Sequence, residues 1–110
     1  MSGQNDNFVY VGKKPLMSYV LAAVMQINTE KREVVIKARG QAISRAVDVA
    51  EVLRHKFVPN AIVKDIRIYT ESLQREDGSP SKVSSIEIVL FRDADKGPAP
   101  AAPAAAAPPK

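Results

Sequence analysis

One local pattern occurs twice in the sequence and restricts the fold more than any other feature. In each copy, a short apolar strand runs through basic residues and a glycine into the start of an amphipathic helix. The first turn, residues 12–15, reads Gly-Lys-Lys-Pro, and the second, residues 37–40, reads Lys-Ala-Arg-Gly. A right-handed crossover would make the two strands parallel neighbours, so we expect both turns at the same end of one sheet.

Both helices are predicted from apolar residues that recur with the helical period. The first helix begins at Pro15, where a missing backbone N–H is tolerated, and the second follows Gly40 and is ended by Pro59. We expect one face of each helix to be buried. The positions on these faces are Leu16, Met17, Val20, Leu21, Val24, Met25 and Ile27 in the first helix and Ile43, Ala46, Val47, Ala50, Leu53 and Phe57 in the second.

After the second helix the apolar period changes to two, which is typical of strands. Residues 62–70 and 83–91 are predicted as two strands, joined by a turn at 76–80 with the sequence Glu-Asp-Gly-Ser-Pro. The flanking segments 71–75 and 81–85 carry few apolar side chains. We therefore expect the tip of this hairpin to project from the core as an arm.

The order of elements predicts an α+β fold, β-α-β-α-β-β, arranged as a two-layer sandwich. A chain of 110 residues with 45% hydrophobic content allows one domain with a modest core. We place this domain at residues 7–93, after a flexible N-terminal segment at 1–6. Residues 94–110 are predicted to be a disordered tail, because the sequence from residue 97 onwards is almost entirely alanine and proline.

The two turns are candidate anion-binding sites. The first turn of a helix leaves backbone N–H groups unpaired, and the helix dipole adds partial positive charge there. Lys13, Lys14 and Arg39 stand beside these ends, which makes phosphate a natural ligand. Two readings without a ligand stay open. The lysines are ordinary solvated side chains, or Arg39 forms a structural ion pair with a carboxylate such as Asp48 or Glu51.

Composition favours a polyanionic partner and disfavours catalysis. The net charge of +4 and the pI near 9.5 suit nucleic acid. With no cysteine and one histidine, the chain offers no nucleophilic or metal-ligating constellation, so we expect no enzyme activity, no cofactor and no metal. The turn at Gly12 lacks the spacing of a P-loop or dinucleotide site. No apolar run is long enough to cross a membrane, and a cytoplasmic or nucleoid-associated protein is expected.

The most specific features are separate blocks of sequence at residues 11–15, 19–23, 36–40, 42–44, 46–48 and 84–88. In this order they resemble the Alba family of archaeal chromatin proteins, over about residues 7–92. The resemblance implies a fold similar to the C-terminal domain of bacterial translation initiation factor three, in agreement with the predicted order of elements. It also implies a homodimer that coats double-stranded DNA without sequence preference and also binds RNA.

The resemblance assigns roles to particular residues. Gln41 stands where relatives often carry a basic residue, so it can donate a hydrogen bond to phosphate but adds no charge. Arg54 and Phe57 are assigned to contacts between dimers along DNA, and Lys13 is a candidate acetylation site whose modification would remove a charge. For Arg45 the alternative is a solvated charge on the helix face. The residues assigned to nucleic-acid binding are Lys13, Lys14, Arg39, Gln41, Arg45, Arg75 and Lys82.

The predicted function is sequence-independent binding of double-stranded DNA by a homodimer that packages or coats chromatin, with RNA binding in addition. Two alternatives stay open. One is an RNA-binding protein that acts mainly in RNA processing or stability, and the other is a regulatory or assembly module whose turns bind a phosphorylated metabolite. Dimerisation has separate support from apolar surface beyond what one thin sheet layer needs. The residues that supply it are Leu53, Phe57, Ile66 and Ile68.

The three tyrosines and the single histidine are expected to have structural roles. Tyr10, Tyr19 and Tyr69 are expected in the core or on a sheet face. None lies within a basic cluster of the sequence, as a base-stacking platform would. The lone His55, near the end of the second helix, is expected to be solvated or to complement the helix dipole.

Overall fold

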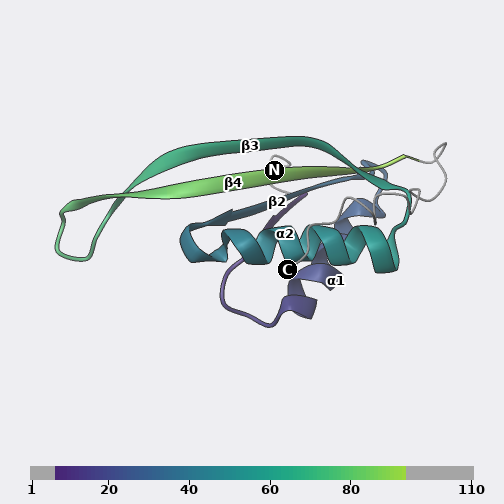
Figure 1. The fold of residues 1–110 in the computed structure, drawn as a ribbon, viewed down its shortest axis with the longest axis horizontal. Helices are drawn as coiled ribbons and strands as arrows, with labels where there is room; N and C mark the ends of the chain where they lie inside the picture. The colour runs from purple at the N-terminus through teal and green to yellow at the C-terminus, as the bar shows by residue number, and fades with distance from the viewer. Residues whose placement is uncertain (1–6, 94–110) are drawn as a thin grey trace, which may run out of the picture.

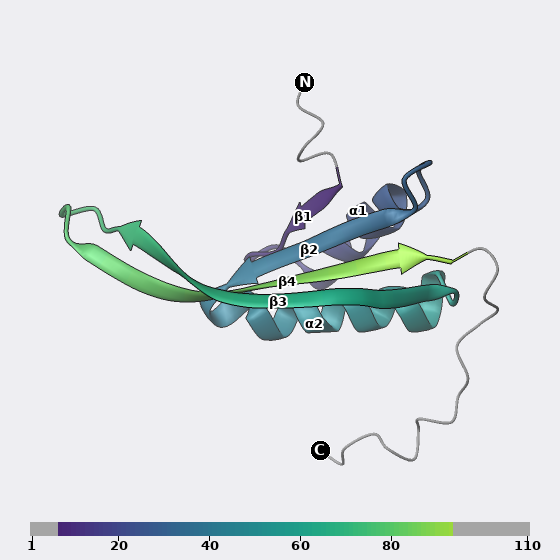
Figure 2. The ribbon, with the colours of Figure 1, turned by 90° about the horizontal axis from the view of Figure 1, so that it is seen from above.

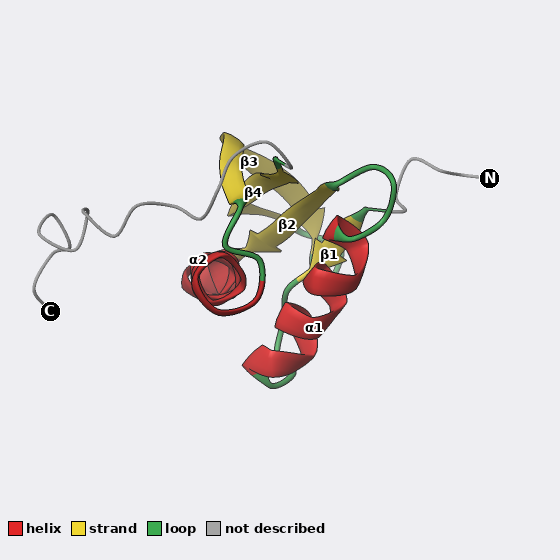
Figure 3. Ribbon diagram, turned by 90° about the vertical axis from the view of Figure 1, so that its right-hand side faces the viewer, coloured by secondary structure: helices red, strands yellow, loops and turns green. Residues whose placement is uncertain are grey.

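The protein has two layers, a four-stranded mixed sheet and two helices that cover one of its faces (Figure 1). The computed structural model describes residues 7–93. Seen end-on, both helices lie on the same side of the sheet (Figure 3). The predicted β-α-β-α-β-β order is confirmed. The elements are β1 (Phe8–Tyr10), α1 (Leu16–Ile27), β2 (Glu33–Arg39), η2 (Gly40–Ala42), α2 (Ile43–Val52), η3 (Leu53–Phe57), β3 (Ala61–Gln74) and β4 (Pro80–Arg92).

The strands lie in the order β1-β2-β4-β3 across the sheet (Figure 2). β1 pairs with β2 in parallel, with Val9 opposite Ile36, and α1 connects the two strands. β4 pairs antiparallel with β2 on one side and with β3 on the other. The predicted parallel neighbours are thus confirmed, and the carboxyl ends of β1 and β2 lie at one end of the sheet.

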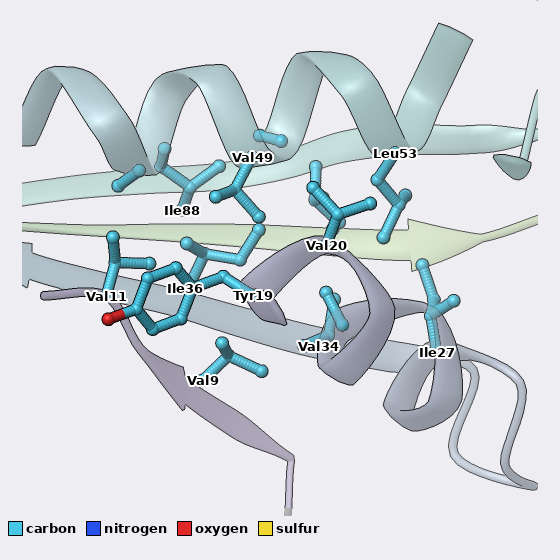
Figure 4. Packing of buried hydrophobic residues seen from close by; sticks show 14 of the residues in the cluster. Val9, Val11, Tyr19, Val20, Ile27, Val34, Ile36, Val49, Leu53 and Ile88 are labelled. Carbon is cyan, nitrogen blue, oxygen red and sulfur yellow. The ribbon is translucent and has the colours of Figure 1, made fainter. Parts of the chain in front are cut away.

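The core lies between the helices and the inner face of the sheet, the face that the helices cover (Figure 4). β2 supplies alternate β-branched side chains to this face, with Val34 and Ile36 fully buried. The prediction that Leu53 supplies apolar surface to a dimer is wrong, because Leu53 is fully buried in the core of its own protomer. The largest fully buried apolar side chains are Ile27, Ile36, Leu53, Leu90, Val20, Val34 and Val49.

The buried face of each helix is narrower than the predicted one. On α1 the expected core positions Met17, Leu21 and Met25 are exposed, and in the second helical segment Val47 and Phe57 are exposed. A helix that rests on a flat sheet buries a single stripe, and α1 is apolar over more of its surface than that stripe occupies. The apolar period therefore predicts the helix without selecting its buried side. The residues that α1 buries are Tyr19, Val20, Ala23 and Ile27.

The β3–β4 hairpin projects beyond the helices, as predicted (Figures 1 and 2). Both strands are longer than the sequence pattern indicated, because the ladder continues through the polar flanks to the pair Gln74 and Pro80. Gly78, with φ of +88°, lies in the turn that joins them. We use the name arm for residues 70–84, the part of the hairpin beyond the last residue of β2. Backbone pairing, and not burial in the core, defines the shape of the arm.

Within residues 7–93 no helix is both long enough and apolar enough to cross a membrane. The flexible segment predicted at 1–6 and the disordered tail predicted at 94–110 lie outside the described residues.

The corrected core assignment can be tested with two matched leucines. Leu53→Ala is expected to lower the free energy of unfolding by about 2–5 kcal/mol, since it leaves a cavity in the core. Leu21→Ala removes the same atoms from a helix position that is 51% exposed. The change expected there is within about 0.5 kcal/mol. Urea unfolding followed by circular dichroism measures both values, and equal losses would contradict the burial of Leu53.

Candidate nucleic-acid interface

The turns that follow β1 and β2 lie together at one end of the sheet and line a common open cleft. They meet there because the two strands are adjacent and parallel. The sequence-based prediction that the two turns converge is therefore confirmed. The cleft is lined by Val11, Gly12, Lys13, Arg39, Gln41, Ala42 and Arg45. We use the name basic rim for the four cations at this end: Lys13, Lys14, Arg39 and Arg45.

Two hydrogen bonds to backbone groups position the first turn. The Lys14 N–H donates to the Tyr19 hydroxyl at 2.9 Å, and the Tyr19 side chain is buried in the core. The Lys14 carbonyl accepts from Nη1 of Arg45 at 3.4 Å, so a half-buried cation on α2 joins the two turns. Lys13 and Lys14 are exposed, and neither forms an ion pair with another of residues 7–93. Both ammonium groups thus face solvent beside the start of α1.

The N-terminal ends of α1 and α2 have the electrostatic character of anion sites. Neither helix has a side-chain cap or an acidic residue in its first turn, although both are the usual way to satisfy these ends. The helix α1 begins at Leu16, one residue later than predicted, so Pro15 occupies the position just before it. Cations stand where acids are normally favoured. An anion in the cleft would therefore relieve an unfavourable arrangement of charge.

Gly40 makes the second turn possible. Its φ of +62° lies in the left-handed region, and a Cβ on it would approach Val83 Cγ2 at 3.4 Å. The chain then forms the short 3₁₀ segment η2. The α-helix α2 therefore begins at Ile43 and not directly after Gly40 as the sequence predicts. This extra turn places Gln41 on the lining of the cleft.

Arg39 has an acidic partner that the sequence did not indicate. Its Nη1 lies 3.4 Å from Oε1 of Glu71, at the base of the arm. The alternative reading of a structural ion pair for Arg39 is therefore right about the carboxylate, but the partner is Glu71 and not Asp48 or Glu51. Glu51 instead binds its helix neighbours Arg54 and His55, at 2.7 and 3.0 Å.

Glu71 is the centre of a polar cluster on the outer face of the sheet, the face opposite the helices. It accepts a hydrogen bond from the Ser85 hydroxyl at 2.7 Å and lies 3.3 Å from the Lys37 ammonium. Ser85, then Lys37 and Arg39, lower the pKa of Glu71 below its ordinary value. Glu71 is therefore ionised at neutral pH and competes with any incoming phosphate for Arg39.

The other assigned residues lie away from the cleft. Arg75 stands at the turn of the arm, where its N–H donates to the Ser79 carbonyl at 2.8 Å, and Lys82 lies on β4 within the arm. Both side chains are exposed. Arg54 and Phe57 lie in η3, at the opposite end of the second helical segment from the basic rim. Phe57 is exposed, whereas Arg54 is half-buried against Glu51.

The described residues offer no cluster suited to a metal ion, since residues 7–93 contain no group of three histidine, aspartate or glutamate side chains that could hold one. His55 contacts Glu51 on the exposed surface of the helix. The arrangement at the basic rim suits electrostatic binding of anions and not proton transfer or metal chemistry.

Comparison with known proteins places this arrangement in a family. Residues 7–70 match the model of the Alba family. The DNA/RNA-binding protein Alba of Thermoplasma volcanium is 59% identical over 87 residues, which cover 79% of this chain and 97% of that relative. Alba 1 of Archaeoglobus fulgidus is 56% identical over 87 residues, with coverage of 79% and 97%.

Solved structures give the same result. The structure of Alba from Thermoplasma volcanium aligns with a TM-score of 0.73 at 58% identity, covering 78% of this chain and all of that chain. ALBA1 from Trypanosoma brucei aligns with a TM-score of 0.59 at 28% identity, covering 81% of this chain and 72% of that chain. The chain belongs to the Alba family, which is not a family of enzymes.

Proposed function

We propose that this protein binds double-stranded DNA without sequence preference, coating or packaging chromatin as a homodimer, and that it also binds RNA. The observation that carries the proposal is the convergence of Lys13, Arg39 and Arg45 on one cleft at uncapped helix ends. The names of the relatives support the same class of ligand, since those proteins are described as DNA/RNA-binding. A protein with this function would be located in the cytoplasm and associated with the nucleoid.

The basic rim would act on the phosphate backbone. Exposed lysines on a turn reach phosphate oxygens readily but carry no sequence information. Gln41 adds a hydrogen-bond donor to the cleft without adding charge. Arg75 and Lys82 place two exposed cations on the arm, among three carboxylates, and are suited to contacts with the backbone or the minor groove. Acetylation of Lys13 would remove one of the exposed charges and weaken binding.

The homodimer has support from apolar side chains that the protomer leaves uncovered. Ile66 and Ile68 lie opposite Ile88 and Ile86 in the ladder, so they share the inner face of the sheet. They remain 54% and 76% exposed, because they lie on the edge strand β3 beside α2 and not beneath it. A two-fold contact through this edge would bury them and double the basic rim. Phe57 and Arg54 remain our proposal for contacts between dimers.

A charge-reversal pair tests the basic rim. Lys13→Glu with Lys14→Glu is expected to abolish duplex binding with the fold intact, because both side chains are exposed and make no ion pair within residues 7–93. Lys31→Glu with Lys56→Glu makes the same change in net charge at exposed positions away from the cleft, and is expected to bind duplex with only a small loss. Gel shifts with one duplex at one salt concentration compare the two pairs.

Salt dependence is the second readout of that experiment. If about six to ten phosphates are neutralised, affinity falls roughly 10³- to 10⁵-fold between about 50 and 200 mM salt. Unchanged duplex binding by the Lys13/Lys14 variant would exclude this site. Binding that is independent of salt concentration and saturates with a mononucleotide would contradict the proposal. It would favour a module that binds a phosphorylated metabolite.

The competition between Glu71 and phosphate predicts a gain of affinity. Glu71→Gln releases Arg39, so duplex affinity is expected to rise about two- to fivefold and the salt slope to steepen by about one. Glu30→Gln removes the same charge from an exposed loop at the other end of β2 from the cleft and controls for net charge. Fluorescence anisotropy across a salt series measures both. An equal gain in the two variants would show that Glu71 has no specific hold on Arg39.

The dimer is tested at the uncovered edge of the sheet. Ile68→Glu is expected to give a folded monomer, since a charge cannot be buried there without a partner and the side chain is outside the protomer core. Leu21→Glu places the same charge on the exposed side of α1 and should leave the dimer intact. Sedimentation velocity at micromolar concentration distinguishes the states, and a monomeric parent protein would contradict the proposed dimer.

A further inference from the structure

An aromatic pair lies on the outer face of β1. Val9 points into the core, so Phe8 and Tyr10 on either side of it point to the opposite face of the sheet. Their rings stack with centroids 5.7 Å apart and an angle of 21° between planes. Tyr10 is nevertheless 57% exposed. The pair contributes little to the core described above and is free for another role.

The neighbours of Tyr10 along the chain cover only one side of its ring. Phe8, two residues earlier, covers one side, whereas Gly12, two residues later, has no side chain to cover the other. The chain stays paired with β2 beyond Tyr10, because the Val11 N–H donates to the Lys37 carbonyl at 2.8 Å. The direction from Tyr10 along the strand therefore leads directly to the cleft, which Gly12 lines.

No cation within residues 7–93 is stacked on the Tyr10 ring. Lys37 is opposite Tyr10 in the register, but its ammonium lies 5.5 Å from the centre of the Tyr69 ring and 3.3 Å from Glu71, toward the other strands. Arg39 and Lys13 line the adjoining cleft. An exposed aromatic face thus stands next to a candidate phosphate site, which is the combination found in platforms for single strands.

We propose that Tyr10 is a stacking platform for an unpaired nucleobase whose neighbouring phosphate lies in the cleft beside Lys13 and Arg39. The inference rests on the proposed function, since it uses the same cleft for phosphate. A base within a duplex is already stacked on its neighbours and has no free face to offer. Tyr10 therefore adds affinity for loops, ends and single strands of RNA or DNA, and adds little for intact duplex.

The test compares single strands with duplex in the full-length chain. Tyr10→Ala is expected to weaken binding of a single-stranded oligonucleotide roughly 5- to 100-fold while duplex affinity is unchanged. Tyr10→Leu keeps an apolar side chain for the fold but removes the ring, so the same loss is expected, and Tyr10→Phe should bind as the parent does. Leu21→Ala, on exposed α1, is the control for lost apolar surface.

Two further probes separate stacking from charge. An abasic strand of equal length keeps every phosphate but has no bases, so Tyr10→Ala and the parent should bind it equally. Matched RNA and DNA strands show whether the sugar alters the preference. Single-strand binding that is unchanged in both Tyr10→Ala and Tyr10→Leu would overturn the proposal. An equal loss on the abasic strand would overturn it as well, and would indicate a docking surface or a structural role.

The outcomes distinguish this inference from the proposed function. If the parent protein fails to bind duplex, the proposed function is wrong, whereas the single-strand measurements still test Tyr10. If duplex binding is normal and depends on Lys13 and Lys14, but the Tyr10 variants match the parent on single strands, only the stacking inference fails. Tyrosine fluorescence gives an independent check, because stacking on a base should quench emission in the parent more than in Tyr10→Leu.

Discussion

The parallel pairing of β1 with β2 is the interaction on which the rest of the structure depends. The seven residues of β2 span about 23 Å, so an antiparallel arrangement would have separated the two turns by the length of the sheet. Parallel pairing puts them at the same end and lets α1 and α2 begin there. The cleft and the convergence of its cations on two helix N-termini follow from this one topological choice.

The same arrangement concentrates like charge, and few contacts offset the repulsion. Arg45 is held by the Lys14 carbonyl, and the turn is held by the Tyr19 hydroxyl, so the positions are maintained by backbone hydrogen bonds and not by ion pairs. Glu71 alone brings an acidic side chain to Arg39 among the described residues. Weak internal neutralisation is what a surface needs if a polyanion is to complete its charge balance. Stability and ligand binding are thereby linked at this end of the molecule.

Local patterns in the sequence were sufficient for the elements, the two turns and their convergence. They were not sufficient for the side chains that meet across the sheet. Glu71 lies beside Arg39 because an irregularity between Val63 and Asp65 inserts one residue into β3. Since side chains alternate with a period of two, that single residue decides which face Glu71 occupies. The sequence around Tyr10 likewise predicts only a place in the core or on a sheet face. Its position opposite Lys37 depends on pairing between distant strands.

The outer face of the sheet explains why binding would concentrate at one end. Arg67 lies 2.9 Å from Glu87 and 2.8 Å from Asp65, and Lys37 contacts both Glu71 and Glu87, so the centre of this face is internally neutralised. A nucleic acid backbone gains little by lying across it. Attraction is left to the basic rim and to Arg75 and Lys82 on the arm. The Tyr10 ring lies on the edge strand β1, two residues before Gly12 of the cleft. A strand held by its phosphates at the rim would therefore be placed to stack an unpaired base on the open side of the Tyr10 ring.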